Sequence, residues 1–291
     1  TPIWEGDELL VPGGETEDAD TVVTPDLATN TTNTVATNTM NENVSAILEA
    51  TIADLGGVPR AGQTEMVEKV FDALETDGHL LVQAGTGTGK SIGYLVPAMY
   101  WSVESGQRVV VSTATLALQR QIVLHDAPRV AEAVHGTCGA RPKVSLLKGW
   151  NNYVCLRKAA GGYPEDDALL SRAAGEYGAS ATGEEVVRLR EWAMSTDTGD
   201  RDDLVPGVSD RAWRQVSISK PECIGNSCPL RGSCFPILSR QEAEDADVVI
   251  TNHSILGLES AGVPILPGAG AYVIDEAHDL VDRVTGQLTV S

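Results

Sequence analysis

The chain has 291 residues, enough for one large or two modest domains with a sizeable core. It carries 41 acidic and 21 basic residues, and this net charge of −20 excludes a protein whose whole surface attracts polyanions. It has no apolar run of membrane-spanning length and no basic-then-apolar start typical of a signal peptide. We therefore expect a cytoplasmic protein without a membrane partner.

The first 45 residues are expected to form a disordered acidic tail. They contain nine acidic residues and no Lys or Arg, they are rich in Thr and Asn, and they lack apolar periodicity. The first methionine is Met40. Residues 1–39 are therefore either an upstream extension of a start at Met40 or a genuine acidic tail, and both readings stay open.

Two helices are expected after this tail. Apolar residues recur at helical spacing from Ile47 to Leu55, and two glycines then end the pattern. The sequence Arg-Ala-Gly-Gln, ending at Gln63, precedes the second helix. The Gln63 side chain has a donor and an acceptor that suit the N6/N7 edge of adenine, although most Gln residues near a helix start are simply solvated.

A glycine-rich loop lies between an apolar run at 80–82, expected to be a short buried strand, and an expected helix from 92. The residues of the loop are Ala84, Gly85, Thr86, Gly87, Thr88, Gly89, Lys90 and Ser91. In such a loop the backbone N–H groups surround an anion, the lysine reaches the β- and γ-phosphates, and the serine hydroxyl ligates Mg²⁺. Ala84 stands where the strict pattern has glycine. The alternative, a glycine-rich turn before a helix, is disfavoured by Gly-Lys-Ser in this context, so the loop predicts binding of a nucleoside triphosphate.

A second buried strand is expected at 108–113. Thr113, Thr115 and Gln119 follow at its carboxyl end, where open α/β sheets bind ligands. These side chains could donate to a DNA phosphate. The alternative is an ordinary strand-to-helix turn capped by threonine.

The alternation of strand and helix stops after a third strand candidate at 144–149 and returns at 247–251, which indicates a mostly helical insertion. Four cysteines bracket the insertion: Cys155, Cys223, Cys228 and Cys234. Three thiols close in sequence with one distant partner are typical of a single metal centre. The spacing favours an iron–sulfur cluster over zinc, and unligated core thiols are the third reading. Cys138 belongs to no cluster.

Basic residues gather in the same part of the chain, since 13 of the 21 Lys and Arg fall within 143–240. They alternate with aromatic residues in a pattern that suits single-stranded nucleic acid. The members of this set are Lys148, Trp150, Tyr153, Arg157, Lys158, Arg211, Trp213, Arg214 and Lys220. The alternative is that the aromatic side chains pack the core of a small domain.

The last apolar run, at 271–274, is expected to be a buried strand in the same sheet as the glycine-rich loop. It ends in Asp275, Glu276, Ala277 and His278. We expect Asp275 to hold Mg²⁺ through water, Glu276 to orient and deprotonate the attacking water, and His278 to relay the state of the nucleotide. Paired acids after a strand are also common as helix caps, but the upstream loop favours the catalytic interpretation.

The ordered set of motifs resembles the iron–sulfur superfamily 2 DNA helicases, the DinG/XPD-like group, and in particular bacterial DinG-type proteins. The set comprises R-A-G-Q at 60–63, A-G-T-G-T-G-K-S at 84–91, S-T-A-T-L at 112–116, the four cysteines, T-N-H at 251–253 and D-E-A-H at 275–278. Ala84 matches the pattern of this group.

The resemblance implies an α/β fold: a RecA-like P-loop motor domain with a parallel sheet, interrupted by an inserted, mostly helical iron–sulfur domain. The implied divisions are a disordered tail at 1–45, motor domain 1 at 46–148 and 238–291, and the cluster domain at 149–237. The implied activity is 5′-to-3′ ATP-dependent DNA unwinding in repair or replication. The implied cofactors are ATP, Mg²⁺ and a [4Fe–4S] cluster on the four cysteines, and Gln63 would recognise adenine.

Motors of this group close over ATP with a second motor domain that supplies arginine fingers, and this chain has thirteen residues after His278. We therefore expect it to be the N-terminal portion of a helicase, with weak or no ATPase activity alone. The alternatives are an ATP-binding switch that binds single strands without motor activity, and a zinc-ribbon ATPase.

Overall fold

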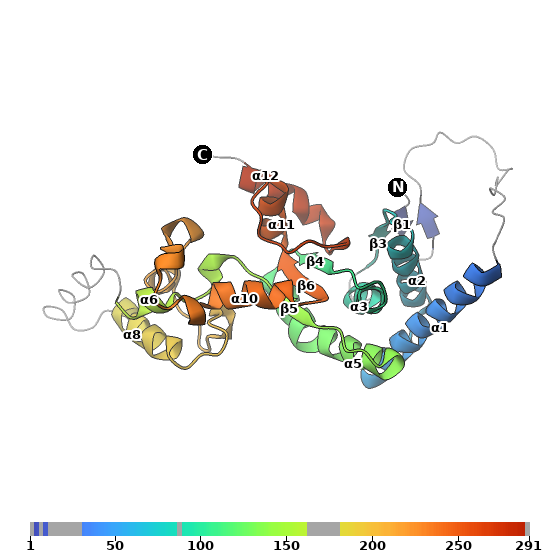
Figure 1. Ribbon diagram of the computed structural model, residues 1–291, viewed down its shortest axis with the longest axis horizontal. Coiled ribbons are helices and arrows are strands. Elements are labelled where there is room, and N and C mark those ends of the chain that lie inside the picture. Colours follow the sequence, from blue (N-terminus) through green and yellow to red (C-terminus); the bar gives the residue numbers. More distant parts are fainter. Residues whose placement is uncertain (1–2, 6–7, 11–30, 86–88, 162–180, 289–291) are drawn as a thin grey trace, which may run out of the picture. The chain divides into compact units, whose positions relative to one another are not determined.

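The structure is a computed structural model that describes residues 3–5, 8–10, 31–85, 89–161 and 181–288 (Figure 1). The chain divides into two compact units. The sheet unit comprises Thr1–Leu146 and Asp245–Ser291, and the inserted unit comprises Leu147–Glu244. No helix among these described ranges is long and apolar enough to cross a membrane.

A four-stranded parallel sheet in the order β5-β6-β4-β7 forms the centre of the sheet unit. Its strands are β4 (Val109–Thr113), β5 (Val144–Leu146), β6 (Val248–Asn252) and β7 (Ala271–Ile274). All of β4 and the first four residues of β6 are buried, as continuous Val and Ile runs in a parallel sheet require. The expected α/β fold with a parallel sheet is confirmed.

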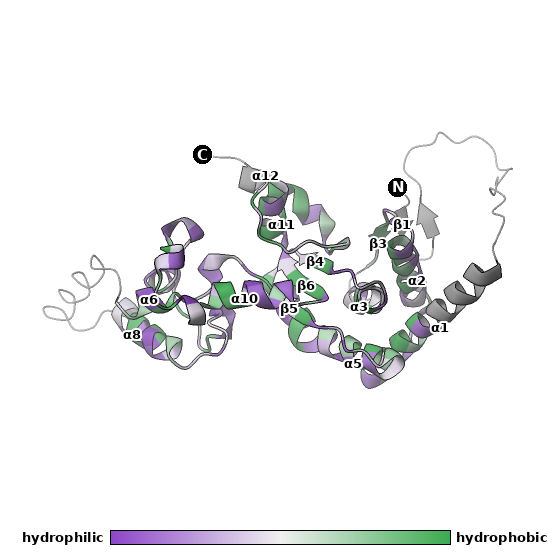
Figure 2. Ribbon diagram, in the orientation of Figure 1, coloured by the Kyte–Doolittle hydropathy of each residue, from purple (hydrophilic) through white to green (hydrophobic). Residues whose placement is uncertain are grey.

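The helices of the sheet unit are α1 (Thr31–Asp54), α2 (Ala61–Glu75), α3 (Lys90–Ser105), α4 (Leu116–Gln121), α5 (Ala127–Cys138), α11 (His253–Ser260) and α12 (Leu280–Leu288). A π-helical turn, Ile122–Asp126, joins α4 to α5. The apolar sides of α1, α2, α3 and α5 form one core with β4 and β6. Figure 2 shows this amphipathic character as alternating hydrophobic and hydrophilic colour along α5.

The N-terminal region differs from the expected disordered tail at 1–45. The helix α1 begins at Thr31, and the strands β1 (Ile3–Glu5) and β2 (Glu8–Leu10) precede it. The physical reason is cooperativity, because Ile47 and Leu48 bury fully and fix the helix, after which each further residue adds a hydrogen bond without a new nucleation cost. At its other end α1 stops at Asp54, and Gly56 follows two residues later with a φ of +72° that favours glycine.

The strand that leads into the glycine-rich loop was expected to be buried and to share a sheet with β7, and both expectations are wrong. This strand, β3 (Leu81–Gln83), pairs in parallel with β1 in a separate sheet of order β2-β1-β3. Leu81 is 47% exposed, and Tyr272 and Ile274 on β7 are exposed as well. A strand edge pairs with whichever strand reaches it, and local sequence does not encode that choice.

The described part of the inserted unit is mostly helical, as expected. It contains α6 (Leu156–Ala159), α8 (Ala181–Ala193), α9 (Asp210–Trp213), α10 (Phe235–Glu244) and several 3₁₀ turns. Its own core includes Leu189, Trp213 and Val216. The predicted insertion at 149–237 lies within the bounds of this unit.

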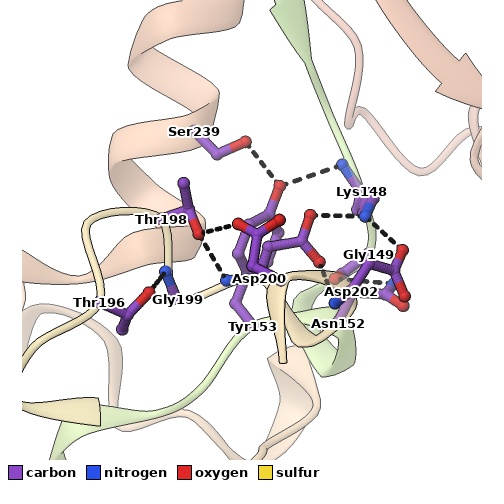
Figure 3. Close-up of polar contacts among 11 residues, drawn as sticks. Lys148, Gly149, Asn152, Tyr153, Thr196, Thr198, Gly199, Asp200, Asp202 and Ser239 are labelled. Atoms are coloured by element: carbon purple, nitrogen blue, oxygen red, sulfur yellow. Dashed lines mark hydrogen bonds and ion pairs between the residues drawn. The ribbon is translucent and has the colours of Figure 1, made fainter. Parts of the chain in front are cut away.

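A buried ion pair organises the polar interior of the inserted unit (Figure 3). The Lys148 side chain is 3% exposed, and its Nζ lies 2.5 Å from Asp200 Oδ2 and 2.6 Å from Asp202 Oδ2. Burial opposes the charge on Lys148, but the two carboxylates outweigh it and raise its pKa. Beside the pair, the Tyr153 hydroxyl contacts Ser239 Oγ at 2.8 Å and accepts a hydrogen bond from Lys148 N.

These contacts correct the nucleic-acid interpretation of several residues. Lys148 is committed to its carboxylates, while Tyr153 and Trp213 are 4% and 3% exposed. Trp213 donates its indole N–H to the Asn151 carbonyl at 2.7 Å. The alternative interpretation, in which these aromatic side chains are buried in the interior of the small unit, is confirmed for both.

We expect Lys148→Met to destabilise the inserted unit. The substitution leaves Asp200 buried without its cation, which typically costs about 3–5 kcal/mol. Hydrogen exchange with mass spectrometry should show the opening free energy of α8 falling by that amount, while β4 and β6 keep their protection. Arg211→Met, at an exposed position, is the control and should change it by less than about 0.5 kcal/mol. A change as small as the control's in Lys148→Met would contradict the role of the pair.

Candidate functional site

The glycine-rich loop leads directly into the N-terminus of α3. Gly89 is the N-cap of α3 and has a φ of +80°, and Lys90 and Ser91 occupy the first helical turn. Unpaired N–H groups and the helix dipole make such a terminus attractive to anions. Ala84 and Gly85 lie on the strand side, whereas Thr86, Gly87 and Thr88 lie outside the described residues.

Gln63 lies against this loop. It belongs to the first turn of α2, its exposed fraction is 8%, and its Nε2 donates to the Gly89 carbonyl at 3.4 Å. A Cβ atom at residue 89 would approach Gln63 Nε2 to 2.5 Å, so close contact and positive φ both require glycine there. The structure thus brings Gln63 to the loop, and its recognition of adenine stays a prediction.

The loop lysine meets the acidic motif that follows β7. Lys90 Nζ lies 2.7 Å from Glu276 Oε1, although the two residues are 186 positions apart. The hydrogen bond from Lys90 lowers the pKa of Glu276 and keeps it ionised. Glu276 has a φ of +53°, a strained conformation for a residue with a side chain, and such strain often marks a functional site.

Asp275 is held from two directions. Its backbone N donates to the Ser112 carbonyl at 2.9 Å, and its carboxylate accepts a hydrogen bond from the Tyr94 hydroxyl at 3.1 Å. Burial and the Asp275 charge both raise the pKa of Tyr94, so the phenol remains a donor. Sequence reasoning missed Tyr94, although it follows Lys90 by four residues and therefore shares its helix face.

The other predicted site residues of the glycine-rich loop and the acidic motif differ in how exposed their side chains are. Asp275 is 9% exposed, while Ser91 is half-buried on α3. Hydroxyl and carboxylate oxygens are the donors that Mg²⁺ prefers, so the chemistry of Ser91 and Asp275 fits this ion. His278 is largely exposed, with Nδ1 at 3.5 Å from Glu276 Oε2 and Nε2 at 3.7 Å from Asp279 Oδ1.

His253, at the start of α11, is a second residue that the sequence-based prediction did not include among the site residues. It is 1% exposed, and its Nδ1 lies 2.7 Å from Ser112 Oγ. Burial lowers its pKa, so the ring is neutral. Its position in T-N-H after a buried strand was the available signal.

The expected DNA contacts at the end of β4 are only partly compatible with the structure. Thr113 and Gln119 are fully buried, so neither side chain can reach a DNA phosphate as placed. Thr115 is exposed, and its Oγ1 accepts from Leu118 N at 3.2 Å as the cap of α4. Gln119 is buried because α4 packs this face against the sheet. A helix of six residues is too short for its periodicity to show which face is buried.

The four bracketing cysteines are half-buried free thiols that precede helical turns in the inserted unit. Burial raises the pKa of Cys155 and Cys234, and the charges of the other cysteines of the set raise both further. Backbone N–H groups act on these sulfurs, including Gly225 N on Cys223 Sγ at 3.4 Å. Soft thiol donors with such hydrogen bonds suit an iron–sulfur cluster.

The side chains of these cysteines do not adopt a metal-ligand arrangement. Within the described ranges, no three His, Cys, Asp or Glu side chains are positioned to hold a metal ion. The donor chemistry therefore fits a cluster, whereas the convergence of the ligands does not, and the cluster stays a prediction.

Comparisons with known proteins agree with the motif order. A family model described as DEAD/DEAH box helicase matches residues 62–146. The chain is 46% identical over 256 residues to a protein of Mycobacterium tuberculosis named ATP-dependent helicase DinG, which covers 84% of this chain and 39% of that protein. It is 36% identical over 233 residues to ATP-dependent DNA helicase YoaA of Escherichia coli, with 78% of this chain and 34% of that protein covered. The chain thus spans less than two fifths of the length of these relatives.

We expect Glu276→Gln to tighten nucleotide binding. In the nucleotide-free state Glu276 competes with the phosphates for Lys90, and neutralising it removes that competitor. A partly exposed ion pair of this kind corresponds to about a two- to fivefold gain in affinity. Titration with a fluorescent ATP analogue and Mg²⁺ measures the change. Asp279→Asn removes a nearby charge without touching Lys90 and should leave the affinity unchanged, and weaker binding by Glu276→Gln would oppose this account.

Proposed function

We propose, from the premise that this chain is homologous to the DinG-like helicases, that it is the ATP-binding part of an ATP-dependent DNA helicase. The observation that carries this proposal is the 2.7 Å contact between Lys90 and Glu276, which unites the phosphate-binding loop with the acidic motif. A loop of this type alone would support any nucleotide-binding protein. The contact between this loop and a second motif, the acidic one at 275–278, supports ATP hydrolysis.

Each group at the site has a role in the proposed reaction. Lys90 would leave Glu276 and bind the β- and γ-phosphates at the N-terminus of α3, and Ser91 and Asp275 would hold Mg²⁺. Glu276, then free, orients the attacking water and accepts its proton. In the nucleotide-free state the hydrogen bond from Lys90 lowers the pKa of Glu276, so the carboxylate is already ionised when Lys90 leaves it. Gln63, against Gly89, contributes the contact to adenine.

We further propose that this chain corresponds to the first motor domain and that a second motor domain of the same protein completes the ATP site. An arginine finger from the opposite domain typically contributes about 10³–10⁵ in rate. Hydrolysis by this chain alone is therefore expected to be weak. Alternating closure of the two domains would drive 5′-to-3′ movement along a single DNA strand in repair or replication, in the cytoplasm.

The inserted unit is proposed to hold a [4Fe–4S] cluster through Cys155, Cys223, Cys228 and Cys234. The soft thiol donors and the backbone N–H groups that act on the sulfurs support this assignment. Such a cluster would crosslink the two ends of the segment from 155 to 234. The exposed Arg211, Arg214 and Lys220 in the same unit supply cations for a DNA strand.

The motor activity is tested with the protein that combines this chain and the proposed second motor domain. We expect its ATPase rate to rise at least about tenfold with single-stranded DNA and to fall by about 10³-fold or more in Glu276→Gln. A coupled-enzyme phosphate assay measures both. Rates that do not respond to DNA, with intact ATP binding, would instead support a nucleotide-binding switch without motor activity.

The cluster is tested by anaerobic purification followed by iron and sulfide analysis. We expect about four iron and four sulfide ions per chain. Cys155→Ser should abolish the visible absorption of the cluster, and Cys138→Ser, which removes the thiol outside the set, should retain it. A colourless protein with one bound zinc ion would overturn the assignment.

A further inference from the structure

We propose that His253 is a positioning residue that couples the end of β4 to the main chain of Glu276, and thus links DNA binding to the nucleotide. This inference rests on the proposed function, because it presumes a DNA strand at the exposed end of β4 and ATP at Lys90. His253 itself touches neither ligand. It would act through Ser112 on one side and through Asp275 and Glu276 on the other.

Ser112 is the centre of this connection. Its carbonyl accepts from Asp275 N at 2.9 Å, and its hydroxyl contacts His253 Nδ1 at 2.7 Å. In the sheet, Ser112 lies opposite Thr251 on β6 and Ile274 on β7. Because Ser112 is fully buried, a shift of the Asp275 main chain cannot be absorbed by solvent and must reach its neighbours.

The two nitrogens of the His253 ring have different surroundings. The main chain at Asp275 and Glu276 raises the pKa of the ring, as carbonyl acceptors do, and burial outweighs this effect. In the tautomer in which Nε2 carries the proton, Nδ1 accepts a hydrogen bond from the Ser112 hydroxyl. Yet Nε2 is buried and makes no hydrogen bond within the described part of the chain.

A buried donor without a partner, next to a strained residue, indicates two arrangements of the main chain. Glu276 has its positive φ in the state in which Lys90 holds its carboxylate. When phosphates take Lys90, Glu276 is released and its main chain can relax. A small movement of the carbonyls at 275 and 276 would then satisfy His253 Nε2, which favours the nucleotide-bound arrangement.

The same movement would reach the carboxyl end of β4, where a DNA strand is presumed. Thr113, next to Ser112, donates its hydroxyl to the Thr115 carbonyl at 3.3 Å, and Thr115 caps α4. Thr115 is exposed at this end of the strand. By thermodynamic reciprocity, a DNA strand that favours one position of this end must also favour one state of the nucleotide site.

The test measures the affinity of this chain for a labelled single-stranded oligonucleotide, without nucleotide and with saturating Mg²⁺ and a non-hydrolysable ATP analogue. We expect the two affinities to differ by about five- to 150-fold, the usual range of allosteric coupling. His253→Asn keeps an acceptor near Ser112 but lacks the outer nitrogen. In this variant the ratio of the two oligonucleotide affinities should fall close to one. Each ligand alone should still bind within about threefold of its affinity for the unsubstituted chain.

Two further variants separate positioning from stability. His253→Gln places an amide N–H near the site of Nε2 and should restore part of the coupling. Asn252→Ala removes the cap of α11, whose Oδ1 accepts from Ile255 N at 3.0 Å, and should reduce thermal stability but keep the coupling.

The outcomes distinguish this inference from the proposed function. Failure of the unsubstituted chain to bind either ligand opposes the proposed function itself. Binding of both ligands with no coupling, or with coupling retained in His253→Asn, overturns the inference alone. If the His253 variants do not fold, hydrogen exchange of the unsubstituted chain decides the matter. DNA binding should then alter protection at residues 271–279, and unchanged protection would refute the connection.

Discussion

The parallel pairing of β4 with β6 on one side and β7 on the other is the constraint on which the site depends. Parallel strands bring their carboxyl ends to one edge of the sheet. That edge therefore collects Ser112, His253 and Asp275 from three distant segments of the chain. Because β4 and most of β6 are fully buried, the register that places these residues cannot slip without exposing the core.

The ion pair between Lys90 and Glu276 is the contact that this arrangement makes possible. Both side chains are about one quarter exposed, so the pair contributes little to stability and is easily exchanged for another partner. Such a pair suits a resting state, because it keeps the base ionised and the cation close while costing little to open. By contrast, the pair of Lys148 and Asp200 is buried and serves to hold a fold.

The inserted unit has a core and a polar interior of its own, which explains how the sheet accommodates it. The entropic cost of a long loop grows only slowly with its length, and a loop that folds independently adds its own stability. The polar interior of this unit joins Lys148 and Tyr153, near its start, to Asp200, 52 positions after Lys148. A cluster on the cysteines would add a further crosslink to a unit that already has a packed core.

The sequence by itself determined the local features. Glycine-rich loop chemistry, continuous Val and Ile strands and helical periodicity each depend on neighbours within a few residues, so the loop, β4, β6 and most helix positions were predictable. Tertiary structure alone decided the pairing of β3 with β1, the burial of Gln119 and the contacts of Tyr94 and His253. These pairings and contacts depend on which distant surfaces pack together when the chain folds. The physical reason is that partner choice and burial are properties of the whole core, which local pattern does not encode.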